Sequence, residues 1–272
     1  MVCNQMPAQK EYSNPKSWRD LQAEPGMIRA LDYADSGAPA IRDNQDDKRR
    51  WSELLADACA WMIADGIRET KLANGLQVLP EAYGEKAEPV IMLGDSKKAV
   101  DVAVVTKTLL GLQVGFSLKG FNTVDAKSGT YDKNLKGRTA DVANEMLFIH
   151  SHLPMAKMVV IYFMPLEAAV DKSSKFSSTF TRAVDLLDRQ TGRAHRYENP
   201  ENSDKSFIAI YSKNDSLGVE RGVLRFFDVS YEPEGAGLPI VLSTLSLAEI
   251  LASHCFLDPR KRNKPQVLTE HL

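Results

Sequence analysis

The stretch KKAVDVAVVTKTLLGLQVGFSLKG, residues 97–120, decides the predicted fold. It reads as two strands joined by a short turn, and strand side chains alternate between the two faces. The apolar side chains of the second strand should face a core: Leu112, Val114, Phe116 and Leu118. The alternate positions should occupy a more open face: Gln113, Gly115, Ser117 and Lys119. We expect Asp101, at the start of the first strand, to meet Lys119. A carboxylate and a lysine on a rigid hairpin can hold a divalent cation beside a phosphate and activate a water.

This spacing resembles the pattern of the PD-(D/E)xK nucleases, the superfamily of many restriction and repair endonucleases. In that family an acidic residue on one strand is followed by an acidic-x-Lys triplet on the next. Asp101 matches the first acid and Lys119 matches the lysine, while Ser117 stands where the second acid is expected. This departure removes one expected metal ligand. Alternatively, Asp101 is a charged residue on an edge strand, or its side chain pairs with Lys97 or Lys98 in a turn.

Composition is that of a soluble globular protein. The chain has 272 residues, of which 43% are hydrophobic and 26% are charged, so one main domain is expected. The net charge of −2 gives no global basic footprint, so any nucleic-acid binding must use a local basic cleft. The 3 cysteines are far apart and form no CxxC pair, which fits a reducing cytoplasm. No apolar run approaches the ~18 residues of a membrane span.

The order of elements around the hairpin predicts the fold class. We expect an N-terminal arm or cap (1–45), a helix (46–67), short apolar runs with at least one strand (75–93), the hairpin (97–120), a helix (138–152) and a buried strand (156–164). This order is similar to the αβββαβ core of the resembled nucleases. We therefore predict a mixed α/β domain over 46–272, with its core in 46–165 and a central mixed sheet flanked by helices.

The rest of the chain predicts a C-terminal elaboration of that domain. A helix is expected around Phe180–Leu187, ending by Gly192, and a final helix should begin at the capping box Ser246-x-x-Glu249. Strands are expected in three places: 206–212, 221–231 and 239–244. Several arginines on or after the first of these helices could extend a basic surface: Arg182, Arg189, Arg193 and Arg196.

The resemblance implies a metal site with further ligands. In the resembled family the first core helix often supplies an acid, and Glu53 is the candidate here, with Asp57 as the second choice. The backbone carbonyl of Leu118 is a natural further ligand. Mg²⁺, or Mn²⁺ in its place, prefers oxygen ligands and retains waters, so two or three protein oxygens suffice. The alternative is that Glu53 and Asp57 are solvated helix charges.

Other polar residues near the hairpin have two readings each. The loop 120–138 is basic and is predicted to bind a polyanion; the alternative is a solvated surface loop. Under the first interpretation the candidate phosphate contacts are Lys127, Lys133, Lys136 and Arg138. Glu145 adds a carboxylate or faces solvent, and the second reading is favoured. His150 and His152 are expected to cap or pack rather than to bind a metal together.

The predicted function is a Mg²⁺-dependent endonuclease that hydrolyses DNA phosphodiester bonds, and the resemblance implies a restriction or antiviral-defence setting. A first alternative is a degenerate nuclease fold that binds nucleic acid or a partner protein without cutting. A second is a metal-free α/β enzyme with Ser117 as nucleophile, although the G-x-S-x-G turn of such enzymes is absent. A homodimer, or a partner defence subunit, fits a task that requires both strands to be cut. No membrane partner is expected.

Overall fold

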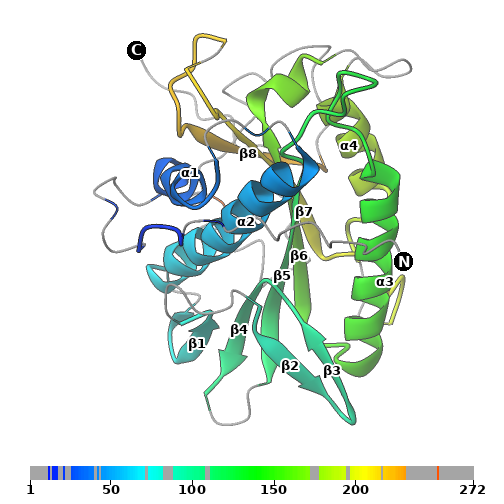
Figure 1. Cartoon of the computed structure of the whole chain (residues 1–272). Helices are drawn as coiled ribbons and strands as arrows, with labels where there is room; N and C mark the ends of the chain where they lie inside the picture. The colour runs from blue at the N-terminus through cyan, green and yellow to red at the C-terminus, as the bar shows by residue number, and fades with distance from the viewer. Residues whose placement is uncertain are drawn as a thin grey trace, which may run out of the picture.

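A six-stranded mixed sheet lies at the centre of the computed structural model (Figure 1). The model describes residues 12, 14–17, 21, 26–39, 42, 44–70, 73–81, 88–107, 111–171, 178–193, 197–215, 217–230 and 250. In spatial order the strands are β1 (Leu76–Leu79), β4 (Val102–Thr106), β5 (Leu112–Gly120), β6 (Lys157–Pro165), β7 (Lys205–Tyr211) and β8 (Leu224–Asp228). The pairs β5–β6 and β6–β7 are parallel, and the other neighbours are antiparallel. The predicted mixed α/β class is confirmed.

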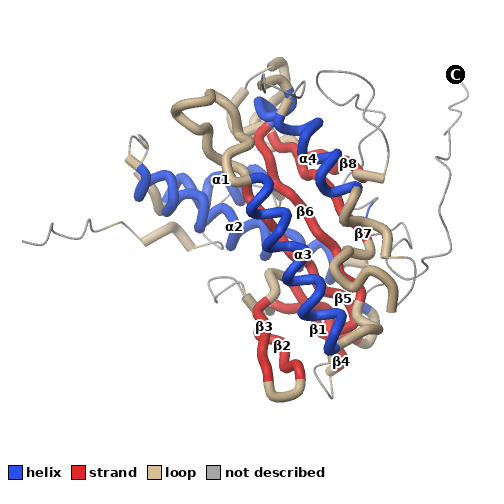
Figure 2. The backbone as a smooth tube through the Cα atoms, turned by 90° about the vertical axis from the view of Figure 1, so that its right-hand side faces the viewer, coloured by secondary structure: helices blue, strands red, loops and turns tan. Residues whose placement is uncertain are grey.

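Helices cover both faces of this sheet (Figures 1 and 2). One face packs on α1 (Met27–Ser36) and α2 (Gln45–Arg68), and the other packs on α3 (Leu135–His152) and α4 (Thr179–Asp188). Strand β6 therefore contributes apolar side chains to both layers, which explains its nearly continuous apolar sequence. A membrane-spanning helix is absent from the described residues, since none is both long and apolar enough.

Helix α2 forms close to its predicted bounds. Asn44 caps it by accepting a hydrogen bond from the amide of Asp47, and an apolar stripe that includes Trp51 and Leu55 is buried against the sheet layer. The helix was expected over 46–67, and it begins at Gln45 and ends at Arg68. Helix α1 packs on α2, so part of the segment expected to be an arm or cap is a short helix that lies on the main body.

The hairpin region differs from its prediction in one respect. The segment 96–106 is split into β3 (Ser96–Ala99) and β4, and β3 pairs with β2 (Val90–Leu93) in a separate two-stranded sheet. The chain changes partners at this point, because the amide of Val100 donates to the Pro89 carbonyl and the amide of Asp101 donates to the Phe116 carbonyl. Asp101 therefore lies just before β4, at the point of exchange.

The alternation predicted for β5 fails at its first residue. Val114, Phe116 and Leu118 pack in the layer of α2, as predicted. Leu112 packs in the layer of α3 instead. The cause is a register shift opposite Val104 and Val105, where Gln113 is the extra, exposed residue.

The second helix, α3, begins at Leu135, three residues before its prediction, so Lys136 and Arg138 lie on a helix rather than in a loop. The predicted helix and first two strands of the C-terminal elaboration are confirmed as α4, β7 and β8. The predicted strand 239–244 lies outside the described residues, and so does the final helix apart from Ile250.

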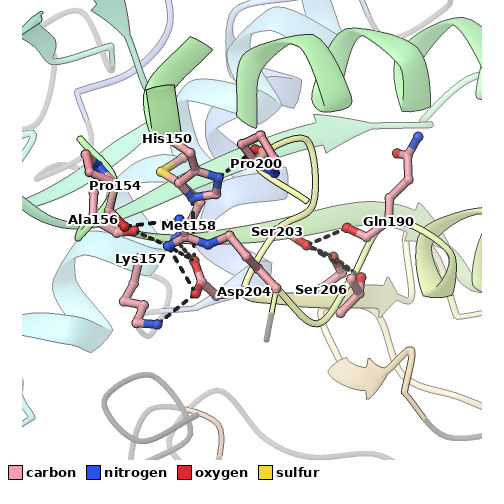
Figure 3. A network of polar contacts seen from close by, with 12 residues as sticks. His150, Pro154, Ala156, Lys157, Met158, Gln190, Pro200, Ser203, Asp204 and Ser206 are labelled. Carbon is pink, nitrogen blue, oxygen red and sulfur yellow. Dashed lines mark hydrogen bonds and ion pairs between the residues drawn. The ribbon is translucent and has the colours of Figure 1, made fainter. Parts of the chain in front are cut away.

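A buried charge network ties α3 to the amino ends of β6 and β7 (Figure 3). Asp204 accepts hydrogen bonds from Lys157 Nζ and from the amide of Met158, both at 2.9 Å. Arg193 Nη2 lies 3.3 Å from Asp204 Oδ2, and His150 Nε2 lies 3.6 Å from the same oxygen. Burial alone would raise the pKa of Asp204, but these hydrogen bonds and the Arg193 charge hold it below its ordinary value.

The two histidines of α3 make packing and capping contacts. The ring of His150 is fully buried, and Nδ1 lies 2.7 Å from the Pro200 carbonyl oxygen. His152 Nδ1 lies 2.8 Å from the carbonyl oxygen of Phe148, and its ring stacks beside that aromatic ring. The arginine of this network, Arg193, is only 4% exposed and therefore adds nothing to the basic surface predicted for it.

Candidate active site

The structure brings Asp101 and Lys119 together, as the sequence predicts, and adds Glu145. Asp101 precedes β4, Lys119 is the penultimate residue of β5, and Glu145 lies in the middle of α3. Lys119 Nζ lies 3.1 Å from Glu145 Oε2. The charges of Lys119 and Glu145 both act on the Asp101 carboxyl group. These three residues define the candidate acid–lysine cluster.

Asp101 is held at the point where β3 gives way to β4. Its Oδ2 accepts a hydrogen bond of 2.6 Å from the amide of Leu118 on the neighbouring strand. Burial raises its pKa to about 6, although the Lys119 charge and the Leu118 hydrogen bond oppose this rise, and the Glu145 charge adds to it. A carboxyl group whose pKa is raised by burial and by a second acid is typical of functional sites.

Glu145 is the acid that the sequence interpretation undervalued. It is only 7% exposed, and its Oε2 accepts hydrogen bonds from Lys119 Nζ and, at 3.0 Å, from Ser117 Oγ. A solvent-facing side chain was the favoured prediction, and it is wrong. The spacing contained the signal, because Glu145 lies three residues after Val142 and four before Ile149, on the buried stripe of α3.

Ser117 does not supply a carboxylate itself, but its hydroxyl group positions the carboxylate of Glu145. Ser117 is fully buried, and its hydroxyl group is bonded to the carboxylate of Glu145. A substrate cannot reach this hydroxyl group in the structure, which argues against Ser117 as a nucleophile. The position where the resembled family has a second acid thus contacts a carboxylate supplied by the helix.

Glu53 lies away from the cluster. It sits on α2, whose buried side chains pack on the face of β5 that carries Phe116 and Leu118, whereas Ser117 contacts α3 on the other face. Glu53 is exposed and pairs with Arg49 on the same helix at 2.8 Å. Its assignment as a metal ligand is therefore corrected, and the same holds for Asp57, whose charge acts on Tyr33 of α1. Nothing in the sequence indicates which face of the sheet α2 covers.

The oxygens of the cluster are of the kind that a hard divalent cation prefers. Asp101 and Glu145 supply two carboxylates. The carbonyl of Leu118 points to the same side of β5 as its amide, and therefore toward Asp101. The described residues contain no group of three or more His, Cys, Asp or Glu side chains that could hold a metal. The set here is two carboxylates with one carbonyl, and Mg²⁺ usually binds through one or two carboxylates while keeping several waters.

The basic residues that follow β5 are only partly brought to the cluster. Arg138 lies on α3 two turns before Glu145, and its charge acts on Tyr162, the residue that pairs with Lys119 across β5 and β6. Lys133 instead pairs with Asp125 inside the loop at 3.2 Å. Lys127 and Lys136 are exposed. Of the predicted phosphate contacts, Arg138 is the best placed.

The other arginines predicted for a basic surface are bound locally. Arg182 pairs with Asp132 of the loop before α3, and Arg189 pairs with Asp185 one turn earlier on α4. Arg196 lies outside the described residues. A continuous basic surface along α4 therefore does not form among the described residues.

Comparison of the chain with family models, with curated proteins and with solved structures found no match. The likeness to PD-(D/E)xK nucleases therefore stays a prediction. It depends on the motif of Asp101 and Lys119 and on the order of elements from α2 to β6.

Asp101→Asn is expected to stabilise the metal-free protein. Folding raises the pKa of Asp101 from 3.8 to about 6, so the folded protein binds more protons between those values and loses stability as pH rises through them. The amide keeps an oxygen for the Leu118 hydrogen bond and removes the buried charge. We expect up to about 3 kcal/mol of added stability near neutral pH.

Urea unfolding in EDTA, at pH values from 4 to 8, measures this effect. The stability difference between Asp101→Asn and the wild type should shrink toward pH 4. Added Mg²⁺ should raise the melting temperature of the wild type and leave that of the variant unchanged. A variant that is destabilised at every pH would contradict the inference that the buried charge of Asp101 destabilises the folded protein.

Proposed function

We propose that this protein is a Mg²⁺-dependent endonuclease that hydrolyses phosphodiester bonds in DNA. The observation that carries the proposal is the ion pair of Lys119 and Glu145, only partly exposed, beside the raised-pKa carboxyl group of Asp101. Two acids and a lysine gathered in one place are groups that metal-assisted phosphodiester hydrolysis can use. The resemblance to nucleases adds the expectation of a restriction or antiviral-defence role.

Each residue of the cluster has a separate part in this proposal. Asp101, Glu145 and the Leu118 carbonyl would hold Mg²⁺, which when bound lowers the pKa of a coordinated water and polarises the phosphate. Ser117 fixes the carboxylate of Glu145 by its hydrogen bond. Lys119 places a positive charge where negative charge builds on the phosphate, and it orients the attacking water. Arg138, two turns before Glu145 on α3, would contact a neighbouring phosphate.

A non-cutting nucleic-acid-binding protein is the second candidate. The observation that favours it is the direct bond between Lys119 and Glu145, because a lysine that stays paired with this acid is not available to a substrate. Binding of Mg²⁺ by Glu145 would release Lys119 from that contact. The two functions therefore differ in whether the cation displaces Lys119 from Glu145.

Plasmid cleavage by the full chain separates the two candidates. With Mg²⁺ or Mn²⁺ the wild type should nick and linearise supercoiled DNA, and EDTA should stop it. Lys119→Ala should lower the rate by about a hundredfold, the usual effect of removing a group that assists proton transfer or charge development. Binding without cleavage in either metal would favour the second candidate. Undiminished cleavage by Lys119→Ala would show that the site lies elsewhere.

A further inference from the structure

The β2–β3 hairpin is an addition that the main sheet does not need. Strands β1 and β4 are antiparallel neighbours, which a two-residue turn can join. Instead the chain leaves the sheet after β1, forms the separate ribbon and returns to β4 at Asp101. Figures 1 and 2 show the ribbon standing out beside α3 at the lower end of the molecule.

One face of the ribbon is fixed to the body of the protein. Ile91 and Leu93 are 4% and 2% exposed and belong to the apolar layer of α3. An isolated two-stranded ribbon is marginal in water, so this burial is what holds it in place. The ribbon is therefore a rigid projection rather than a loose loop.

The outer face of the ribbon carries apolar side chains and a lysine. Val90 is 56% exposed and Met92 is 65% exposed. Directly opposite residues of an antiparallel pair project to the same face, so Lys97, opposite Met92, and Ala99, opposite Val90, share it. Two large apolar side chains held in water on a fixed surface indicate a binding face.

The base of the ribbon adjoins Asp101 of the acid–lysine cluster. The amide of Val100 donates to the Pro89 carbonyl at 3.1 Å and closes the base of the ribbon, and Asp101 follows at once. A four-residue strand extends ~13 Å from that base. This length corresponds to about four base pairs of a duplex, since base pairs rise ~3.4 Å.

We propose that the β2–β3 ribbon enters the major groove of duplex DNA beside the cleaved phosphate and reads its sequence. This proposal rests on the proposed nuclease function and names its substrate as a duplex. The major groove admits a two-stranded ribbon, and other proteins read bases with ribbons in this way. Met92 and Val90 supply apolar contacts for thymine methyl groups, and Lys97 supplies a donor for guanine or a charge for phosphate.

Binding to duplexes with and without thymine methyl groups tests the proposal. The probes are two pools of short duplexes with a randomised centre, one made with thymine and the other with uracil, and Ca²⁺ replaces Mg²⁺ so that binding is measured without cleavage. The wild type should bind the thymine pool about fourfold more tightly for each methyl group it contacts. Met92→Ser should lose the part of this preference that depends on Met92, and the double variant Val90→Ser/Met92→Ser should bind both pools equally.

Charge and surface controls complete the experiment. Lys97→Ala should weaken binding to both pools and reduce the salt-dependence slope by about 1. Lys107→Ala, at the far end of β4, and Leu217→Ser, another exposed apolar side chain, should behave like the wild type. Unchanged binding by both Met92→Ser and Lys97→Ala would overturn the proposal. A wild-type dimer that Met92→Ser converts to a monomer would also overturn it, because the face would then belong to a second copy.

The two proposals fail separately in these assays. A wild type that prefers thymine through Met92 but never cleaves plasmid keeps the ribbon proposal and loses the nuclease. A wild type that cleaves plasmid while both ribbon variants bind like the wild type keeps the nuclease and loses the ribbon proposal.

Discussion

Glu145→Gln is expected to lower Mg²⁺-dependent plasmid cleavage by about a thousandfold, the upper range for removal of one charge-stabilising group from an active site. The change keeps the shape of the side chain and its ability to accept from Ser117, but it removes the charge that pairs with Lys119. It also removes one of two carboxylates offered to the cation. Single-turnover cleavage rates with saturating Mg²⁺ measure the effect.

Glu53→Gln is the matched control. It makes the same chemical change in Glu53, the acid that the sequence analysis predicted as a metal ligand. In the structure Glu53 is exposed on α2 and paired with Arg49. Exposed helix pairs contribute little, so activity should stay within about twofold of the wild type. Equal losses in the two variants would indicate a general charge effect. Full activity of Glu145→Gln would remove Glu145 from the site.

Asp204→Ala is expected to destabilise the protein by about 3–5 kcal/mol, the cost of breaking a buried ion pair from one side. The change leaves Arg193 and His150, whose side chains are 1% and 0% exposed, without the carboxylate they face. It also removes the acceptor for the Met158 amide at the start of β6. Urea unfolding at neutral pH measures the loss.

The pH dependence of Asp204→Ala provides a second check. The folded-state pKa of Asp204 is lowered, so its contribution is present above the ordinary aspartate range near ~3.9 and is lost as pH falls below it. The variant and the wild type should therefore converge in strong acid. Asp185→Ala, which breaks an exposed pair with Arg189, should change stability by less than ~1 kcal/mol. If Asp185→Ala lost as much stability as Asp204→Ala, the buried network would not contribute more to stability than an exposed ion pair.

Local pattern was enough for most of the fold. The continuous apolar run of β6 predicts a strand buried on both faces, and its neighbours on both sides confirm this. The spacing of three and four in α2 predicts its helix to within a residue at either end. The split between β3 and β4 could not be predicted, because nothing in 97–106 marks where the chain changes its hydrogen-bonding partner.

The candidate site was predicted only in part. Asp101 and Lys119 lie on strands joined by one connection, so their meeting follows from local pairing. The third member of the cluster comes from α3, and its place depends on how that helix rotates against the sheet. Glu145 shares the spacing of Val142 and Ile149, but a charged side chain is not expected to be buried with apolar ones. Its burial is explained only by the partners that the tertiary structure brings to it, such as Ser117.

The sequence by itself determined the order of elements, the faces of most strands and the pairing of an acid with a lysine at the end of β5, because these depend on periodicity and on neighbours along the chain. Only the tertiary structure decided which helix supplies the second carboxylate. The two candidate helices pack on opposite faces of the same sheet, and side chains on one face cannot reach the other. That choice excludes Glu53 and selects Glu145.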